Sequence, residues 1–391
     1  MLPAYFDPIR ERIAATIRRF FQEKAEELAR VNPLGRDAAE RLVEFTLRGK
    51  MIRGCLVHLG WSIGSEGGAQ ESAFGGAQES AFGGAQESAF GGAGNEGSAG
   101  ARPDETDSVA AAGAAMELFQ SGLLVHDDIM DRDLVRRGQP SIFQQYTELA
   151  GRQGHADPAH IGQALGICAG DVACFMAFEL LARVRAPAVA LGEVLALCAR
   201  ELSVVGIAQM QDVAWGASKD GVNVDDILRM YRYKTGRYSF SLPLLAGAHI
   251  AGARRDLREK LEAFGESLGL LFQIRDDELG LFGNEKQLGK PVGSDVREGK
   301  KTILISLLLE AAQPGERTRL DGILGNARAS DEDLDFIRDL AATAGVRSRM
   351  DAITGRLAGQ ARDAIRSLTC GTPDDRIALQ GLLDFTIARR Q

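Results

Sequence analysis

The chain has 391 residues, of which 45% are hydrophobic, and its formal net charge is −8. This composition predicts a globular protein and excludes an intrinsically disordered chain. The negative charge argues against nucleic acid as a partner, because phosphate backbones are bound by basic surfaces. The five cysteines form no CxxC pair, so we expect neither a zinc site nor a disulfide framework, and we expect a cytoplasmic location. No uninterrupted apolar run approaches the roughly 18 residues of a transmembrane helix, so we expect no membrane span.

Segment 7–31 predicts an amphipathic helix, because its apolar residues recur three and four positions apart. The composition changes at residues 67–90, where GGAQESAF occurs three times, and GGAGNEGSAGARPDE follows. These small and polar residues bury too little apolar surface to offset the entropy lost on ordering. We therefore expect a flexible low-complexity insertion at about 65–105, and we favour a tolerated surface loop over a partner-docking tail.

After the insertion, helical periodicity continues almost to the end of the chain. Segment 188–216 repeats apolar residues at helical spacing, and no segment shows a convincing strand alternation. No second linker interrupts residues 106–391. We therefore predict an all-α fold, with residues 1–391 forming a single helical domain around one large core.

An unusual amount of charge follows an apolar run in LLVHDDIMDRDLVRRG, residues 123–138. If this stretch is helical, Asp127 and Asp131 lie on one face about 6 Å apart along the axis, with Asp128 beside them. Carboxylates at that spacing repel each other, so cations are expected among them, and oxygen ligands of this kind suit Mg²⁺. Arg136 and Arg137 would then contact phosphate oxygens. The alternative is a solvated acidic helix end.

A second acidic cluster occurs in FQIRDDELG, residues 272–280, which again places two aspartates, Asp276 and Asp277, after an apolar helix. Three basic residues follow, Lys290, Lys300 and Lys301, together with one further acid, Asp295. Two acidic helix ends, each followed by basic residues, predict a cavity with a charged mouth and an apolar interior.

These segments resemble the trans-isoprenyl diphosphate synthase family, which includes farnesyl and geranylgeranyl diphosphate synthases. The two acidic segments resemble the aspartate-rich motifs of the family, and the stretches GKMIRG (49–54), AQMQD (208–212) and YKTGRYSF (233–240) resemble three further motifs in the same order. The resemblance implies an isoprenoid synthase-type helical bundle around a central cavity, usually a homodimer. It also implies Mg²⁺-dependent condensation of isopentenyl diphosphate with an allylic diphosphate.

The resemblance assigns a role to each matching residue. The magnesium-binding carboxylates would be Asp127, Asp131 and Asp276, with Asp128 and Asp277 beside them. The allylic diphosphate would contact Arg136, Lys234 and Lys290, and Lys300 would also bind substrate. Isopentenyl diphosphate would contact Lys50, Arg53, Gln120 and Arg137. The reacting centre would be lined by Thr235, Gln209 and Gln273. Taken singly, Lys50 and Lys234 would more often be solvated surface lysines, and Gln120 a packing amide.

Three positions depart from the family pattern. Gly280 replaces the third aspartate of the second motif, Gly54 replaces a proline, and Ala208 replaces a glycine. The latter two are backbone changes that leave the side-chain roles in place. Gly280 removes one carboxylate, which is the expected mark of a weakened or silent member, but the remaining basic residues are intact and we expect activity.

Product length in the family depends on bulky residues shortly before the first aspartate. Here those positions are Gly122 and Leu123, which leave the floor of the cavity open. On a helix, Met116, Phe119 and Leu123 share the face that leads to Asp127. Phe119 is the next candidate floor residue, so we predict a C20 product with C25 as the alternative. The competing interpretation is that Phe119 is an ordinary core aromatic.

Two other functions fit part of the pattern. A class I terpene cyclase shares the paired acidic motifs and Mg²⁺, but it needs no isopentenyl site, and Lys50, Arg53 and Arg137 therefore argue against it. A non-catalytic subunit of a heteromeric synthase is supported by Gly280 alone. Helical scaffolding does not account for the ordered motifs.

Overall fold

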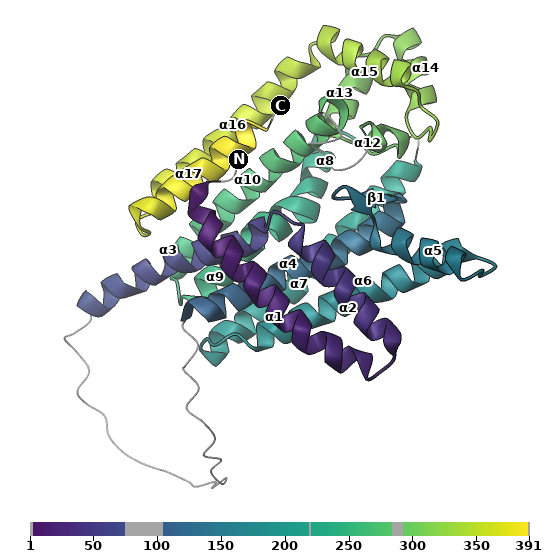
Figure 1. The fold of residues 1–391 in the computed structure, drawn as a ribbon. Helices are drawn as coiled ribbons and strands as arrows, with labels where there is room; N and C mark the ends of the chain where they lie inside the picture. The colour runs from purple at the N-terminus through teal and green to yellow at the C-terminus, as the bar shows by residue number, and fades with distance from the viewer. Residues whose placement is uncertain (1–2, 75–104, 219, 284–291, 390–391) are drawn as a thin grey trace.

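The computed structural model describes residues 3–74, 105–218, 220–283 and 292–389 (Figure 1). The longer helices are α1 (Asp7–Ala29), α2 (Pro33–Leu47), α3 (Ile52–Phe74), α4 (Glu105–Asp131), α6 (Pro158–Ala182), α7 (Ala188–Ala217), α10 (Arg255–Phe282), α15 (Asp331–Thr343), α16 (Val346–Ser367) and α17 (Pro373–Ile387). The shorter elements are η1 (Ala4–Phe6), α5 (Ile142–Arg152), α8 (Val224–Tyr231), η2 (Arg232–Ser241), α9 (Leu242–Ile250), α12 (Ser294–Arg297), α13 (Ile303–Ala311) and α14 (Pro314–Ile323).

The predicted all-α fold is confirmed. Across the described residues, β-structure is limited to a two-stranded antiparallel hairpin of β1 (Val135–Arg136) and β2 (Gln139–Pro140), which the sequence did not predict. Its turn contains Arg137 and Gly138, both with positive φ, so the chain reverses sharply just after α4. The hairpin therefore holds two predicted phosphate-binding arginines beside the first acidic cluster.

The predicted insertion at about 65–105 differs from the structure at its start. α3 continues to Phe74, into the segment that was expected to be flexible from about residue 65. Residues 75–104 lie outside the described part of the chain. The buried apolar residues form one continuous cluster that extends from Phe6 to Leu383, and the single domain stays a prediction.

Two long helices, α4 and α10, carry the acidic clusters at their C-terminal ends. α4 packs most extensively against α6 and also contacts α1 and α3, whereas α10 packs against η2 and α16. The alanines of α4 let its neighbours approach closely, and Met116, Leu118 and Phe119 are at most 1% exposed. Close packing along both helices fixes where their charged ends lie.

By length and composition, α4 and α6 are the described helices apolar enough to be candidate membrane spans. The apolar window of α4 is 83% buried within the fold, as expected for a core helix, whereas that of α6 is 44% buried. The unburied part of α6 includes Phe175, and exposed apolar residues continue on α7 with Ile207 and Met210. We define these three residues together with Ile167 and Val213 as the α6/α7 apolar face.

The two ends of the chain lie near each other beside α10 (Figure 1). The hydroxyl of Tyr5 donates to Asp375 at 2.7 Å, which joins the N-terminal segment to α17. Beyond α17, the chain reaches Arg389, whose guanidinium lies 2.7 Å from Asp276 on α10. The C-terminal segment therefore contributes directly to the candidate site.

Candidate active site

Two lysines face the first acidic cluster at the end of α4. Lys300 Nζ lies 2.5 Å from Asp131 Oδ2, and Lys234 Nζ lies 3.9 Å from Asp127 Oδ1. Burial and the charge of Asp127 raise the pKa of Asp131, although Lys300 opposes that shift. Burial alone would lower the pKa of Lys300, but the carboxylates around it raise that pKa well above its ordinary value. The cluster therefore concentrates carboxylates that need nearby cations.

Asp128 is more deeply buried than the other two aspartates of this cluster. It is 0% exposed, and Oδ1 accepts a hydrogen bond from Arg136 Nε at 2.6 Å. Arg136 also donates to Asp133 at 2.6 Å. Burial raises the pKa of Asp128 to about 7, with Arg136 opposing. Asp128 Oδ2 is buried and has no hydrogen-bond partner among the described residues. The expected roles of Asp128 and Arg136 toward metal and diphosphate remain predictions.

The second acidic cluster lies at the end of α10. Asp277 accepts hydrogen bonds from the Tyr231 hydroxyl and, at 2.8 Å, from Gln273 Nε2. Burial, followed by the charge of Asp295, raises its pKa to about 8. Asp276 is more exposed and pairs with Arg389. The two adjacent aspartates therefore have different environments, one enclosed and one open.

The wider turn of η2, a π-helix, connects the two clusters. Lys234, within it, donates to Asp212 at 2.5 Å while facing Asp127. The next residue, Thr235, donates to Gln273 at 2.8 Å, and Gln273 in turn contacts Asp277. π-Helical turns often occur at functional sites because they redirect successive side chains. One segment thus reaches both acidic helix ends.

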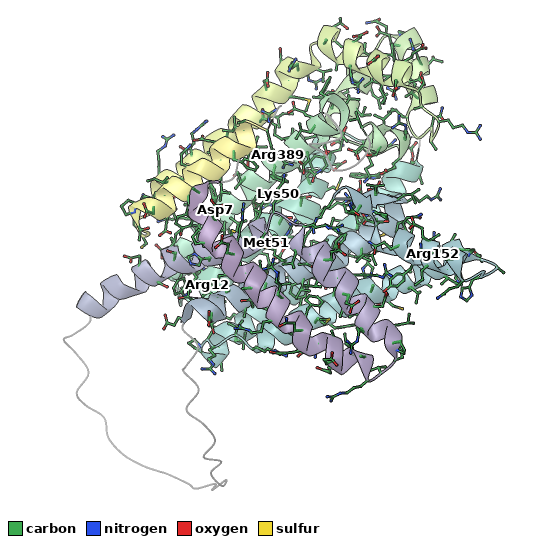
Figure 2. All side chains as sticks on the ribbon, in the orientation of Figure 1. Asp7, Arg12, Lys50, Met51, Arg152 and Arg389 are labelled. Atoms are coloured by element: carbon green, nitrogen blue, oxygen red, sulfur yellow. The ribbon has the colours of Figure 1, made fainter. Side chains whose placement is uncertain are left out.

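A basic group lies beside the carboxylates. Arg53 donates to Ser239 at 2.5 Å, and Arg137 donates to the Phe45 carbonyl at 2.5 Å. Burial, reinforced by the charge of Arg53, lowers the pKa of Arg137 to about 10. Burial and then the charge of Arg389 lower the pKa of Lys50 (Figure 2). We call Lys50, Arg53, Arg137 and Arg389 the basic group.

The remaining predicted residues are distributed less evenly. Gln209 is 7% exposed, and its Nε2 has no hydrogen-bond partner within the described parts of the chain. Gln120 is half-buried on α4. Lys290 lies outside the described residues. Thus the structure brings Lys234, Thr235, Gln273 and Lys300 to the acidic clusters and gathers Lys50, Arg53 and Arg137 beside them.

The residues expected to set product length line up below the first acidic cluster. Leu123 is half-buried, whereas Phe119 is 0% exposed and packs edge-on against Phe178 of α6, with ring centroids 4.8 Å apart. Phe119 lies about 12 Å along the helix from Asp127, and Met116 about 17 Å. The enclosed position of Phe119 suits both a floor residue and an ordinary core aromatic.

Gly122 has a packing reason for being small. A Cβ at this position would lie 2.8 Å from the Gly170 carbonyl and 2.6 Å from Cys174 Sγ, both on α6. The glycine therefore permits α4 and α6 to approach closely. Its lack of a side chain was interpreted from the sequence as an open floor, but the space beside it is filled by α6.

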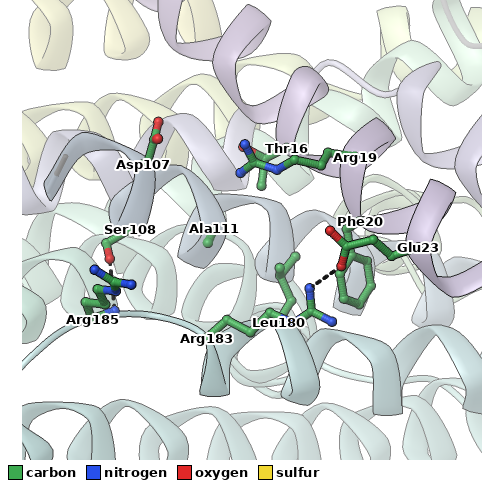
Figure 3. Close-up of a pocket in the computed structure, with 10 residues that line it drawn as sticks. All are labelled: Thr16, Arg19, Phe20, Glu23, Asp107, Ser108, Ala111, Leu180, Arg183 and Arg185. Atoms are coloured by element: carbon green, nitrogen blue, oxygen red, sulfur yellow. Dashed lines mark hydrogen bonds and ion pairs between the residues drawn. The ribbon is translucent and has the colours of Figure 1, made fainter. Parts of the chain in front are cut away.

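A small cavity of about 120 Å³ opens at the opposite end of α4 (Figure 3). Ala111 lies on its wall, about 24 Å along the helix from Asp127. The wall also carries Arg19 and Arg183, and Arg183 is paired with Glu23 at 2.7 Å. This lining of mixed charge therefore lies far from the first acidic cluster.

The donor set of the site suits magnesium. No three acidic, histidine or cysteine side chains among the described residues are already close enough to form a complete metal site. Mg²⁺ usually binds through one or two carboxylates, with water and substrate phosphates completing its shell. Asp127, Asp131 and Asp276 offer such carboxylates, and the side chains of Lys300 and Arg389 supply positive charge beside two of them.

Sequence reasoning missed several residues of this site. Arg389 lies more than 100 positions from Asp276 in sequence, so no local pattern connects them. Tyr231 immediately precedes the RYKTGRYSFS segment, and Asp212 ends AQMQD. The aspartate that ends one motif and the tyrosine that lies just before another were the available signals for the partners of Lys234 and Asp277.

The fold and site define a helical protein with two opposed carboxylate clusters and a separate basic group. A family model described as polyprenyl synthetase matches residues 38–341, and the chain belongs to this family. More particularly, the similar proteins place it among short-chain trans-prenyl diphosphate synthases. The predicted family is thus confirmed.

Three comparisons illustrate this relationship. The geranylgeranyl diphosphate synthase of Sulfolobus acidocaldarius is 35% identical over 285 residues, which span 72% of this chain and 80% of that protein. The short chain isoprenyl diphosphate synthase of Methanocaldococcus jannaschii is 36% identical over 233 residues, 60% of this chain and 65% of that protein. A crystal structure of geranylgeranyl pyrophosphate synthase from Corynebacterium glutamicum, complexed with isoprenyl diphosphate and magnesium, has a TM-score of 0.84 at 26% identity, covering 98% of this chain and 99% of that one. Other similar proteins are farnesyl and geranylfarnesyl diphosphate synthases.

Proposed function

We propose that this protein is a Mg²⁺-dependent prenyltransferase that condenses isopentenyl diphosphate with an allylic diphosphate to make geranylgeranyl diphosphate. The observation that carries the proposal is the presence of two adjacent anion-binding regions of different composition. One consists of the two aspartate clusters, with Lys234 and Lys300 beside Asp127 and Asp131 of the first. The other is the basic group, whose Lys50, Arg53 and Arg137 lie beside the acidic clusters and whose Arg389 pairs with Asp276. Two diphosphates in one site require two such regions.

The allylic diphosphate belongs at the acidic clusters. Asp127, Asp131 and Asp276 would hold magnesium, which would neutralise the diphosphate and stabilise the charge that develops as it departs. Lys234 and Lys300 add positive charge at the same place and are already held there by Asp212 and Asp131. Preorganised charges of this kind lower the barrier to breaking the allylic C–O bond.

Isopentenyl diphosphate belongs at the basic group. Lys50, Arg53 and Arg137 hold its diphosphate. Gln120, which is half-buried on α4, adds a polar contact. Thr235, Gln209 and Gln273 line the reacting centre, where their polar atoms orient the two substrates. The double bond of isopentenyl diphosphate attacks the allylic cation, and a proton then leaves to the released diphosphate. The hydrocarbon chain extends along α4 toward Leu123 and Phe119.

We also propose a homodimer formed through the α6/α7 apolar face. Ile207 and Met210 are 67% and 68% exposed, and Phe175 is 71% exposed. An exposed apolar surface of this kind usually marks a contact with another protein. Replacing Phe175 and Met210 with aspartate should produce monomers in sedimentation, whereas an unchanged dimer would contradict this interface. We retain the cytoplasmic location, because the five cysteines are free.

The main alternatives make different demands on the same residues. A terpene cyclase needs one diphosphate site, so the basic group would have no substrate. A non-catalytic subunit is suggested by Gly280, although the first acidic cluster, Lys234 and Lys300 are all present at the site. Product lengths of C15 and C25 remain the alternatives to C20.

Steady-state kinetics test the proposal. Lys50→Ala should raise KM for isopentenyl diphosphate by about tenfold, as expected for a lost charged contact, and leave KM for the allylic primer nearly unchanged. Lys300→Ala should lower kcat and raise KM for the allylic substrate. Turnover of an allylic diphosphate to a cyclic product without isopentenyl diphosphate would favour the cyclase, and folded protein without turnover would favour the silent subunit.

A further inference from the structure

We infer that Asp295 supplies the third acidic group of the second cluster in place of the side chain missing at Gly280. This inference rests on the proposed function, because it concerns how the same site binds magnesium with a diphosphate. It assigns a binding role to a residue outside both aspartate-rich motifs. It also explains how a chain with glycine at position 280 retains a complete acidic cluster.

The carboxylate of Asp295 lies where a residue-280 side chain would project. Position 280 is one helical turn after Asp276 on the same face of α10. A Cβ built on Gly280 would lie 2.9 Å from Asp295 Oδ2, closer than ordinary contact distance. An aspartate at 280 would therefore compete with Asp295 for the same space.

Backbone hydrogen bonds hold Asp295 against α10. The Gly293 amide donates to the Gly280 carbonyl at 2.9 Å, and the Lys300 amide donates to the Asp295 carbonyl at 2.9 Å. Gly293 has φ of 80°, which lets the chain turn directly into α12. Arg297 closes the turn by donating to the Val292 carbonyl at 2.8 Å. The absence of a side chain at 280 permits this close approach.

The charge of Asp295 acts on both acidic clusters. On the α10 side, its negative charge helps to raise the pKa values of Asp277 and Tyr231. On the α4 side, it helps to raise the pKa of Lys300, whose ammonium group lies 2.5 Å from Asp131. Asp295 therefore lies close enough to act on both clusters, and its Oδ2 lies at the surface of α10 beside Gly280, where a magnesium ion and its water ligands would need an acceptor. Acidic groups around a metal commonly change its affinity 10–100-fold.

Transposing the carboxylate tests the inference. Isothermal titration calorimetry would measure Mg²⁺ affinity of the full chain with inorganic diphosphate for wild type, Asp295→Asn, Asp295→Glu, Gly280→Asp and the Gly280→Asp/Asp295→Asn double variant. Asp363→Asn, which neutralises an exposed carboxylate on α16, is the matched control. Thermal unfolding confirms that each variant is folded.

We expect Asp295→Asn to weaken Mg²⁺ binding by about tenfold. The double variant should return to within about threefold of wild type, because the carboxylate is restored from α10. Asp295→Glu should retain most of the affinity, and the Asp363 control should match wild type. Wild-type affinity in Asp295→Asn, or a double variant as weak as that single variant, would overturn the inference and leave the synthase proposal intact. Wild type that binds no Mg²⁺ with diphosphate would overturn both.

Discussion

Truncating Phe119 to alanine should lengthen the product. The phenyl ring is fully buried against Phe178 and lies about 12 Å along α4 from Asp127. Without the ring, the next large side chain on this face is Met116, about 4.5 Å further along the helix. That distance is close to the length of one extended isoprene unit. We therefore expect Phe119→Ala to shift the main product from C20 to C25.

The same substitution has a predictable cost in stability. Deleting a fully buried phenylalanine ring usually destabilises a protein by about 3–5 kcal/mol. Partial filling of the cavity by a longer prenyl chain should recover part of that loss when product is bound. The assay is chain-length analysis of dephosphorylated products by chromatography, with labelled isopentenyl diphosphate and a farnesyl primer, below the unfolding temperature of the variant.

Phe21→Ala is the matched control, because it removes another buried phenyl ring, 3% exposed, from α1. It should lose comparable stability and make the wild-type product. If folded Phe119→Ala also makes only the wild-type product, Phe119 is an ordinary core aromatic and the floor lies elsewhere. If both variants lengthen the product, general loosening of the core explains the change.

Three further predictions concern charge. Asp127→Asn should lower kcat by roughly 10³-fold and raise the Mg²⁺ concentration needed for half-maximal rate, because it removes a carboxylate that faces the departing diphosphate. If this variant kept the wild-type dependence on magnesium, Asp127 would not belong to the metal site. Arg389→Gln should raise KM for isopentenyl diphosphate by about tenfold with little effect on the allylic substrate, because the guanidinium lies near Lys50; equal effects on both substrates would instead point to its pairing with Asp276. Burial lowers the pKa of His58 below its ordinary value of 6.5, so the unfolded chain binds the His58 proton more tightly than the folded chain does. The folded state therefore loses stability as the pH falls below 6.5, by at most about 1.4 kcal/mol per pH unit. Thermal unfolding at pH 5.5 and 7.5 should therefore differ less in His58→Asn than in wild type, and an equal difference would exclude His58 as the source.

The helical fold and much of the site could be predicted because they depend on local patterns. Helical periodicity in the apolar residues is a direct consequence of a buried helix face, and it correctly indicated α4 and α10 with Asp127, Asp131 and Asp276 at their ends. The order of motifs then identified the family, which the polyprenyl synthetase match confirms. The two-residue strands of the hairpin were too short to give an alternating pattern.

The remaining features depend on contacts between distant segments. Arg389 reaches Asp276 because α17 returns along α10, and no sequence pattern encodes that return. Asp128 and Arg136 turn inward toward each other, which depends on how the hairpin folds back over α4. Gly122 was interpreted as an open floor, but its contact with Gly170 and Cys174 follows from the crossing of α4 and α6. Such pairings require the tertiary structure.

The most direct test of the two-site account is a crystal structure of the full chain with Mn²⁺, a non-reactive allylic diphosphate analogue and isopentenyl diphosphate. Anomalous scattering would locate the metal ions. We predict ions between Asp127, Asp131 and Asp276 on the allylic diphosphate, with the isopentenyl diphosphate on Lys50, Arg53 and Arg137 without metal. Metal ions elsewhere, or a single diphosphate spanning both regions, would contradict the account.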